Sequence, residues 1–130
     1  MSSNRVIIVD DEEGMRELTK EVLRNAGLEV ETATSATDFL DRVKKGSLRP
    51  KDIGLVLLDV MMPDMTGIEL CNHLRNTPEL RGIKVAFLTV VQYSKFSISE
   101  NIKKLGVLDY IQKPYGNQDL VERVKRMLSQ

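Results

Sequence analysis

Three short apolar runs punctuate the chain, at residues 6–9, 55–58 and 85–88, and none of them alternates with polar residues. Such runs are typical of strands that are covered on both faces, as in a parallel sheet between layers of helices. Residues 29–33 alternate polar and apolar positions instead, which predicts a strand at the edge of the sheet. A weaker apolar segment, residues 107–111, is the fifth predicted strand.

Apolar residues at helical spacing occupy the segments between these strands. Glycines follow three of the helical patterns and predict where those helices end, and Asn117 is a favourable N-cap for the last helix. The predicted helices lie within residues 15–26, 36–43, 66–74, 98–105 and 120–128, and the glycines are Gly27, Gly46 and Gly106.

The regular alternation of strand and helix, repeated five times, predicts the fold class. Repeated βα units require a parallel sheet with right-handed crossovers and with helices on both faces. The expectation is therefore an α/β protein, a doubly wound (βα)5 fold in three α/β/α layers. A length of 130 residues suits a single domain over residues 1–130.

Composition narrows the classes of partner and the compartment. The 19 basic and 19 acidic residues cancel, which argues against an electrostatic grip on nucleic acid or on an anionic membrane. Apolar residues make up 42% of the chain, and no apolar run approaches the length of a membrane span. The single cysteine, Cys71, excludes an internal disulfide and favours a reducing compartment, so we expect a cytoplasmic protein.

Polar residues follow the predicted strands where their carboxyl ends should meet. Asp10 and Asp11 follow the first strand, and Asp59 follows the third. Thr89 and Lys113 follow the fourth and fifth. In open α/β sheets, ligands bind at this end of the strands. Crowded carboxylates favour Mg²⁺, a carboxylate can accept a phosphoryl group, and a hydroxyl and an ammonium can hold the phosphoryl oxygens.

These motifs, taken together and in this order, resemble those of the receiver domain of response regulators from two-component signal transduction, including the chemotaxis regulators. The resemblance covers the whole chain and implies a flavodoxin-like sheet of strand order 2-1-3-4-5. The motifs are VIIVDDE at the first strand, LLDVMMPDMTG at the third, FLT at the fourth and DYIQKPY at the fifth.

The resemblance also implies a role for each site residue. Asp59 would be the phosphoacceptor, and Mg²⁺ would bind Asp11 and Asp59 directly and Asp10 through water. The backbone carbonyl of Met61 would be a further ligand. The other implied roles are phosphoryl binding and switching by Thr89, Lys113 and Tyr110, and a cis peptide bond between Lys113 and Pro114.

The implied partners are a histidine kinase or phosphotransfer protein as phosphoryl donor, and a downstream protein. The downstream protein would bind the face made by the fourth helix, fifth strand and fifth helix. The chain would be a signalling module that assists only its own phosphorylation and dephosphorylation, and would not otherwise be an enzyme.

Plainer interpretations of the same residues remain open at the level of sequence. Asp10 and Asp11 are suitable caps for the first helix, and Asp59 and Asp64 are suitable turn residues. A Mg²⁺-dependent phosphohydrolase usually carries a second aspartate two residues after its nucleophile, and Met61 stands there instead. A nucleotide or flavin carrier would need a glycine-rich loop after the first strand, where four acidic residues stand.

The segment after Thr89 departs from the family pattern. Val90 stands where the family usually has a small residue, and we expect its methyl groups to hinder small phosphoryl donors and attacking water. The segment from Thr89 to Lys113 looks slightly longer than usual and carries two further aromatic residues within residues 91–97, which leaves the start of the fourth helix open.

Overall fold

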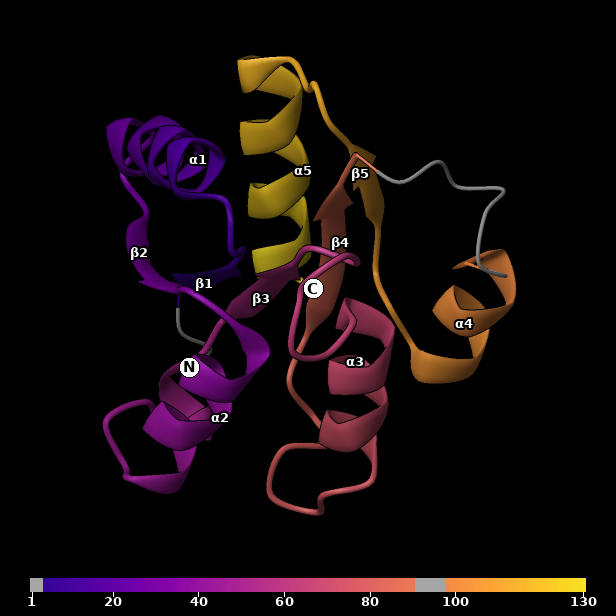
Figure 1. The fold of residues 1–130 in the computed structure, drawn as a ribbon. Coiled ribbons are helices and arrows are strands. Elements are labelled where there is room, and N and C mark those ends of the chain that lie inside the picture. Colours follow the sequence, from indigo (N-terminus) through magenta and orange to yellow (C-terminus); the bar gives the residue numbers. More distant parts are fainter. Residues whose placement is uncertain (1–3, 91–97) are drawn as a thin grey trace.

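The computed structural model describes residues 4–90 and 98–130. Five parallel strands form one sheet in the order β2-β1-β3-β4-β5 (Figure 1), which confirms the predicted fold class and strand order. Within the described ranges, no helix combines the length and apolar character needed to cross a membrane. The strands are β1 (Arg5–Val9), β2 (Glu29–Ala33), β3 (Leu55–Leu58), β4 (Val85–Thr89) and β5 (Tyr110–Gln112), and the helices are α1 (Glu13–Asn25), α2 (Ala36–Lys44), α3 (Gly67–Arg75), α4 (Ile98–Leu105) and α5 (Asn117–Leu128), with a 3-10 turn, η1, at Pro50–Asp52.

The uninterrupted apolar runs serve two hydrophobic cores, one on each face of the sheet. Side chains alternate between the faces along a strand. In β1, Val6 and Ile8 therefore pack with α1 and α5, whereas Ile7 and Val9 pack with α2, α3 and α4. The strands β3 and β4 divide their side chains in the same way. Because the central strands are packed on both faces, the positions of the polar residues at their carboxyl ends are fixed as well.

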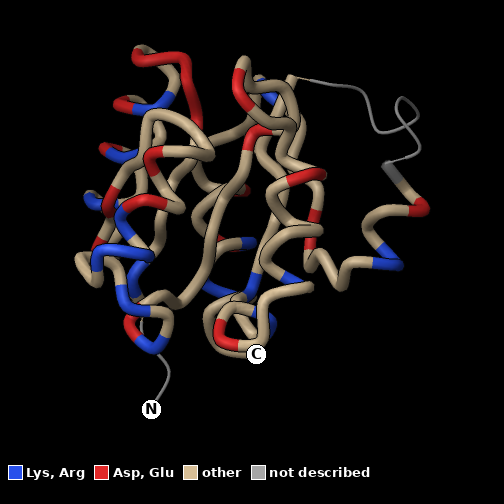
Figure 2. Tube along the Cα trace, turned by 60° about the horizontal axis from the view of Figure 1, so that its bottom comes forward, with Lys and Arg blue, Asp and Glu red and all other residues tan. Residues whose placement is uncertain are grey.

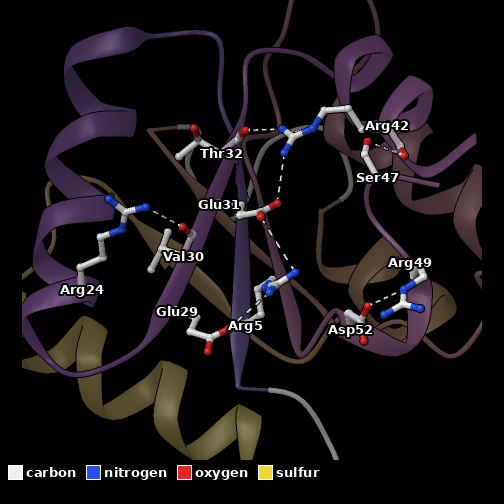
Figure 3. Close-up of polar contacts among 10 residues, drawn as sticks. All are labelled: Arg5, Arg24, Glu29, Val30, Glu31, Thr32, Arg42, Ser47, Arg49 and Asp52. Carbon is white, nitrogen blue, oxygen red and sulfur yellow. Dashed lines mark hydrogen bonds and ion pairs between the residues drawn. The ribbon is translucent and has the colours of Figure 1, made fainter. Parts of the chain in front are cut away.

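The strand β2 lies at one edge of the sheet, as its alternating pattern predicted. On the outer side of an edge strand, every second backbone carbonyl has no neighbouring strand from which to accept a hydrogen bond. Arg24 of α1 donates to the carbonyl of Val30 at 3.1 Å, and Arg42 of α2 donates to that of Thr32 at 2.5 Å (Figure 3). These two guanidinium groups occupy positions at which a further strand would bond.

Ion pairs accompany these caps along the same edge. Arg42 lies 3.1 Å from the carboxylate of Glu31, and Arg5 lies 3.5 Å from Glu29 and 3.9 Å from Glu31. Nearby, Arg49 pairs with Asp52 at 2.8 Å (Figure 3). We refer to β2 with Arg5, Arg24 and Arg42 as the β2 edge.

Two predicted boundaries were wrong. The fifth strand runs from Tyr110 to Gln112 and not over residues 107–111, because Gln112 pairs with Thr89 although its side chain is polar and exposed. Gly116, not Asn117, is the N-cap of α5, and no side chain caps that helix end. In both places the backbone position differs from the one that side-chain character favours. Residues 91–97 lie outside the described part of the chain.

Candidate functional site

The structure brings the predicted polar residues together at the carboxyl end of the sheet. Asp10 follows β1 and Asp59 follows β3, and these two strands are neighbours. Thr89 ends β4, and Lys113 follows β5. All four side chains are buried although they are polar or charged. Burial of this kind is unusual for charged groups unless they are paired or bind a ligand.

Three carboxylates form a cluster that suits a divalent cation. Asp10, Asp11 and Asp59 each offer an oxygen atom, and these atoms lie within 4.8 Å of one another. Asp10 and Asp59 are buried, whereas Asp11 is exposed. The four consecutive acidic residues 10–13 form the longest red stretch of the tube in Figure 2. Oxygen ligands at this density are those that Mg²⁺ prefers.

Lys113 brings a positive charge into this cluster. Its Nζ lies 2.5 Å from Oδ2 of Asp10 and 3.7 Å from Oδ2 of Asp59. Only 4% of the Lys113 side chain is exposed, so water screens the pair weakly. The Lys113–Pro114 peptide bond is cis. Lys113 therefore pairs with two of the three carboxylates, and the cluster keeps a net negative charge when all three are ionised.

The Asp59 carboxyl has a pKa above its ordinary value, mainly because burial disfavours the charged form. The charge of Asp10 raises this pKa further, whereas hydrogen bonding by the Thr89 side chain and the charge of Lys113 lower it. The backbone N–H of Met61 also donates to Oδ1 of Asp59 at 3.2 Å. A cation bound beside Asp59 would favour the ionised form that a nucleophile requires.

Tyr110 and Thr89 occupy adjacent strands beside this cluster. Tyr110 pairs with Phe87 in the parallel register of β4 and β5, and Thr89 pairs with Gln112. Burial raises the pKa of the Tyr110 hydroxyl, and the charge of Asp59 raises it further. The backbone carbonyl of Tyr110 accepts from Arg123 of α5 at 3.3 Å. The backbone thus connects the site to the outer helix α5.

Two apolar side chains near the cluster reach solvent. The Met61 side chain is 49% exposed and that of Val90 is 64% exposed. The side chain of Met61 therefore belongs to neither core, and the role of its backbone carbonyl as a metal ligand stays a prediction. Val90 directly follows Thr89, and its exposure shows that this side chain lies outside both cores.

Helix capping, the plain interpretation of Asp10 and Asp11, belongs to a different residue. Glu12 is the N-cap of α1, and its carboxylate accepts from the N–H groups of Gly14 at 3.1 Å and Met15 at 2.6 Å. Asp10 accepts from the N–H of Glu12 at 3.0 Å with its other oxygen. Helix capping thus leaves Asp11 and the second oxygen of Asp10 available to the cluster.

Gly67 matters for a reason that the sequence did not reveal. A Cβ atom at this position would lie 2.3 Å from the backbone carbonyl oxygen of Asp59. Its N–H donates to the carbonyl of Val60 at 2.8 Å. The glycine therefore lets the start of α3 approach the backbone of the acceptor residue. Asp59 and Gly67 stand at the two ends of one loop, and the distance between their backbones cannot be read from the sequence.

Asp64 was interpreted as a turn residue, and the structure gives it a specific partner. Its Oδ2 accepts from the N–H of Thr37 at 2.8 Å and from the hydroxyl of Thr37 at 2.6 Å. These bonds lower the pKa of Asp64, the hydroxyl contributing most. The loop that follows Asp59 is thereby attached to the first turn of α2.

Comparison with known proteins yields a consistent set of matches. The family model of the response regulator receiver domain matches residues 6–125. The transcriptional regulatory protein TdiR of Thauera aromatica is 33% identical over 98% of this chain and 52% of its own length. The phosphate regulon regulator PhoB of Rhizobium meliloti is 34% identical over 95% and 52%. The chain thus spans about half the length of the curated relatives it matches.

Solved structures agree with these matches. A CheY-like receiver domain protein from Methanospirillum hungatei is 31% identical, with a TM-score of 0.82 over 98% of this chain and 95% of its own. The chemotaxis protein CheY4 of Vibrio cholerae is 26% identical, with a TM-score of 0.81 over 97% and 99%.

Proposed function

We propose, from the premise that this chain belongs to the receiver domain family of response regulators, that it accepts a phosphoryl group on Asp59. The observation that carries this proposal is the position of Asp59. Its carboxylate follows a buried strand, lies within reach of Lys113 at 3.7 Å, and shares a cluster with two further carboxylates. These are the parts that phosphoryl transfer to a carboxylate needs.

The reaction would transfer the phosphoryl group from a phosphohistidine. An oxygen of the Asp59 carboxylate attacks phosphorus, the phosphorus–nitrogen bond breaks, and the imidazole leaves with the electron pair of that bond. The product is an acyl phosphate on Asp59. Lys113 would move from its pair with Asp10 toward the phosphoryl oxygens, and the Thr89 hydroxyl would donate to one of them.

The carboxylate cluster fits Mg²⁺ as the cofactor. Asp11 and Asp59 would hold the ion directly, Asp10 would hold it through water, and the Met61 carbonyl would complete the protein ligands. Bound Mg²⁺ would neutralise negative charge on the phosphoryl oxygens. The raised pKa of Asp59 supports this assignment, since a nearby cation favours the ionised carboxylate.

The partner surface is proposed to be the face of α4, β5 and α5. Thr89 ends β4, and Tyr110 lies on the neighbouring strand β5, which is part of this face. Arg123 of α5 contacts both the Tyr110 carbonyl and, at 3.6 Å, the Asp109 carboxylate. A rearrangement of Thr89 around a phosphoryl group would therefore reach α5 through β5.

The proposed partners are a histidine kinase or phosphotransfer protein as donor and a downstream protein on that face. The domain would bind neither nucleic acid nor membrane itself and would work in the cytoplasm. It would act as a phosphoacceptor that is used again after hydrolysis, and not as an enzyme on external substrates.

Intact-mass measurement with acetyl phosphate and Mg²⁺ tests the acceptor. The parent should gain the mass of one phosphoryl group, and Asp59→Asn should gain none. Asp64→Asn is the matched control, since it removes a carboxylate from the same loop and should leave the modification intact. Modification of the Asp59→Asn protein at any other residue would overturn the assignment.

Beryllofluoride, a phosphoryl mimic, tests the switch separately. Chemical-shift changes should extend from Asp59 along β5 and into α5. Changes that stay within the carboxylate cluster would contradict the proposed partner surface and leave the phosphoacceptor assignment standing.

A further inference from the structure

The loop between β3 and α3, residues 59–66, is fixed to the rest of the molecule at three places. At its start, the N–H of Met61 donates to Asp59. At its end, Thr66 and Glu69 form a capping box, and Gly67 donates to Val60. The third place lies in the middle of the loop, where Asp64 contacts Thr37 of α2. This contact joins residues 27 positions apart.

The contact has the geometry of a helix cap that comes from elsewhere in the chain. Thr37 lies in the first turn of α2, where backbone N–H groups have no partner within the helix. Ser35 caps the same helix by accepting from Asp38 at 3.0 Å, and Asp64 takes the N–H of Thr37. A carboxylate also interacts favourably with the positive end of the helix dipole. The α2 terminus thus holds an anionic side chain of the acceptor loop.

We infer that the Asp64–Thr37 pair is a positioning device for the metal site. It holds the middle of the β3–α3 loop, and with it the Met61 backbone, beside the carboxylates that would bind Mg²⁺. This inference rests on the proposed function, because it concerns the same metal. Asp64 itself contacts no ligand of the cluster among its hydrogen-bond partners, so it acts through the loop backbone.

Both hydrogen bonds from Thr37 end on one oxygen, Oδ2. This detail separates a mechanical role from an electrostatic one. An asparagine at position 64 keeps one oxygen acceptor and loses the negative charge, whereas an alanine loses both. If the loop must be held in place, Asp64→Asn should bind Mg²⁺ nearly as the parent does. If the charge of Asp64 attracts the cation, the two variants should be weakened equally.

Titration of the unphosphorylated protein with Mg²⁺, followed by NMR, measures the affinity without any phosphoryl transfer. Asp64→Ala should bind Mg²⁺ about tenfold more weakly, as expected when a group that orients a metal ligand is removed. Thr37→Val should give a smaller loss, because the N–H contact remains, and Thr37→Ser should restore the parent affinity.

Ser35→Ala is the matched control. It removes a hydrogen bond from the same terminus of α2 and does not touch the β3–α3 loop. Its Mg²⁺ affinity should equal that of the parent, even if both Ser35→Ala and Asp64→Ala lower the melting temperature. Amide hydrogen exchange in residues 61–66 should accelerate in Asp64→Ala and not in Ser35→Ala.

Three results would overturn the inference. They are a parent-like affinity in Asp64→Ala, equal losses in Asp64→Ala and Asp64→Asn, and an equal loss in Ser35→Ala. If the parent itself does not bind Mg²⁺, the proposed cofactor is wrong and the inference falls with it. A parent that binds Mg²⁺ beside an Asp64→Ala variant that binds it equally well removes only the inference.

Discussion

At the β2 edge the carboxylates of Glu29 and Glu31 each lie within 3.9 Å of an arginine, whereas at the carboxyl end of the sheet Lys113 pairs with two of three clustered carboxylates. The edge groups are partly exposed, and their charges balance locally. The site groups are mostly buried, and their charges do not balance. Both regions are rich in charge, and the arrangement of charge distinguishes them.

The exposed ion pairs of the β2 edge and the buried carboxylates of the site have different roles. Exposed ion pairs contribute little to stability by themselves, about 0–1 kcal/mol. The arginines at the edge matter chiefly because two of them also donate hydrogen bonds to carbonyl groups of β2 that no strand within the described residues pairs with. Buried carboxylates with one counter-ion repel one another, and a cation that arrives relieves the repulsion. The balanced charges of the β2 edge therefore fit a structural role, and the excess negative charge of the carboxylate cluster fits a site for a cation.

The largest effect on stability should come from removing Lys113, the cation of the carboxylate cluster. Lys113→Met leaves Asp10 and Asp59 buried without their counter-ion. Breaking a buried pair in this way typically costs about 3–5 kcal/mol, so chemical unfolding in metal-free buffer should show a loss of about 3 kcal/mol. Millimolar Mg²⁺ should recover part of that loss.

Lys20→Met supplies the matched control on the surface. Lys20 lies 3.7 Å from Glu17 in a partly exposed pair on α1, and its loss should cost less than about 1 kcal/mol. Equal losses in the two variants would show that the buried cluster is no more dependent on its cation than the surface is.

The site residues were predictable because each lies at or just after the carboxyl end of a predicted strand. A run such as residues 55–58 predicts both the strand and the place where Asp59 emerges. The contacts of Gly67 and Asp64 were not predictable in the same way. They depend on how close α3 comes to Asp59 and on where α2 begins relative to the β3–α3 loop, and these distances are set by the packing of the whole molecule.

The failures at element boundaries have a related cause. Gln112 belongs to β5 because its backbone pairs with Thr89, and hydropathy carries no information about that pairing. Similarly, Glu12 caps α1 where Asp10 and Asp11 were equally suitable caps, because all three are acidic residues just before the helix. Strand registers and the choice among adjacent acidic residues require coordinates.

The next largest effect on stability should come from removing the arginines of the β2 edge. The double variant Arg24→Ala, Arg42→Ala removes the caps from Val30 and Thr32. Each lost hydrogen bond costs about 1 kcal/mol, so stability should fall by about 2 kcal/mol. The uncovered edge should also pair with other chains, which light scattering after size-exclusion chromatography would detect as concentration-dependent association.

Arg49→Ala is the control for that variant. It removes an arginine from an exposed pair near the same edge, with Asp52 as its partner, and it uncovers no carbonyl of β2. It should associate no more than the parent and be nearly as stable. If the double variant also associates no more than the parent at any concentration, the arginines do not close the edge to a further strand.

Removing one of the crowded carboxylates should have a smaller effect on stability. The folded protein raises the pKa of Asp59 above its ordinary value of 3.8. The folded state therefore favours the protonated form, and the stability gained from it is lost as pH rises through the raised pKa. At neutral pH without Mg²⁺, Asp59→Asn should consequently melt at a higher temperature than the parent.

The pH dependence checks the sign of that effect. The difference in melting temperature should disappear below pH 3.8, where Asp59 is protonated in both the folded and the unfolded states. Above the raised pKa the difference should be constant. Mg²⁺ should reduce it at neutral pH, because the cation binds the ionised carboxylate of the parent only. A variant that is less stable than the parent at neutral pH would contradict the unfavourable crowding at the site.

The smallest effect on stability should come from Val90, where the site meets solvent. Val90→Ala removes two methyl groups from a side chain that is 64% exposed, so the melting temperature should hardly change. The expected change is kinetic. Water that hydrolyses the acyl phosphate must approach phosphorus opposite the Asp59 oxygen, and Val90 directly follows Thr89, the residue proposed to bind the phosphoryl group.

The alanine variant should therefore lose its phosphoryl group faster than the parent and accept one faster from acetyl phosphate. Both rates follow from a time course of intact mass after the donor is removed or added. The alternative is that the size of Val90 serves packing alone. The exposure of this side chain argues against packing, because the methyl groups bury little surface. Equal half-lives of the acyl phosphate in two equally stable proteins would show that Val90 does not control access to the site.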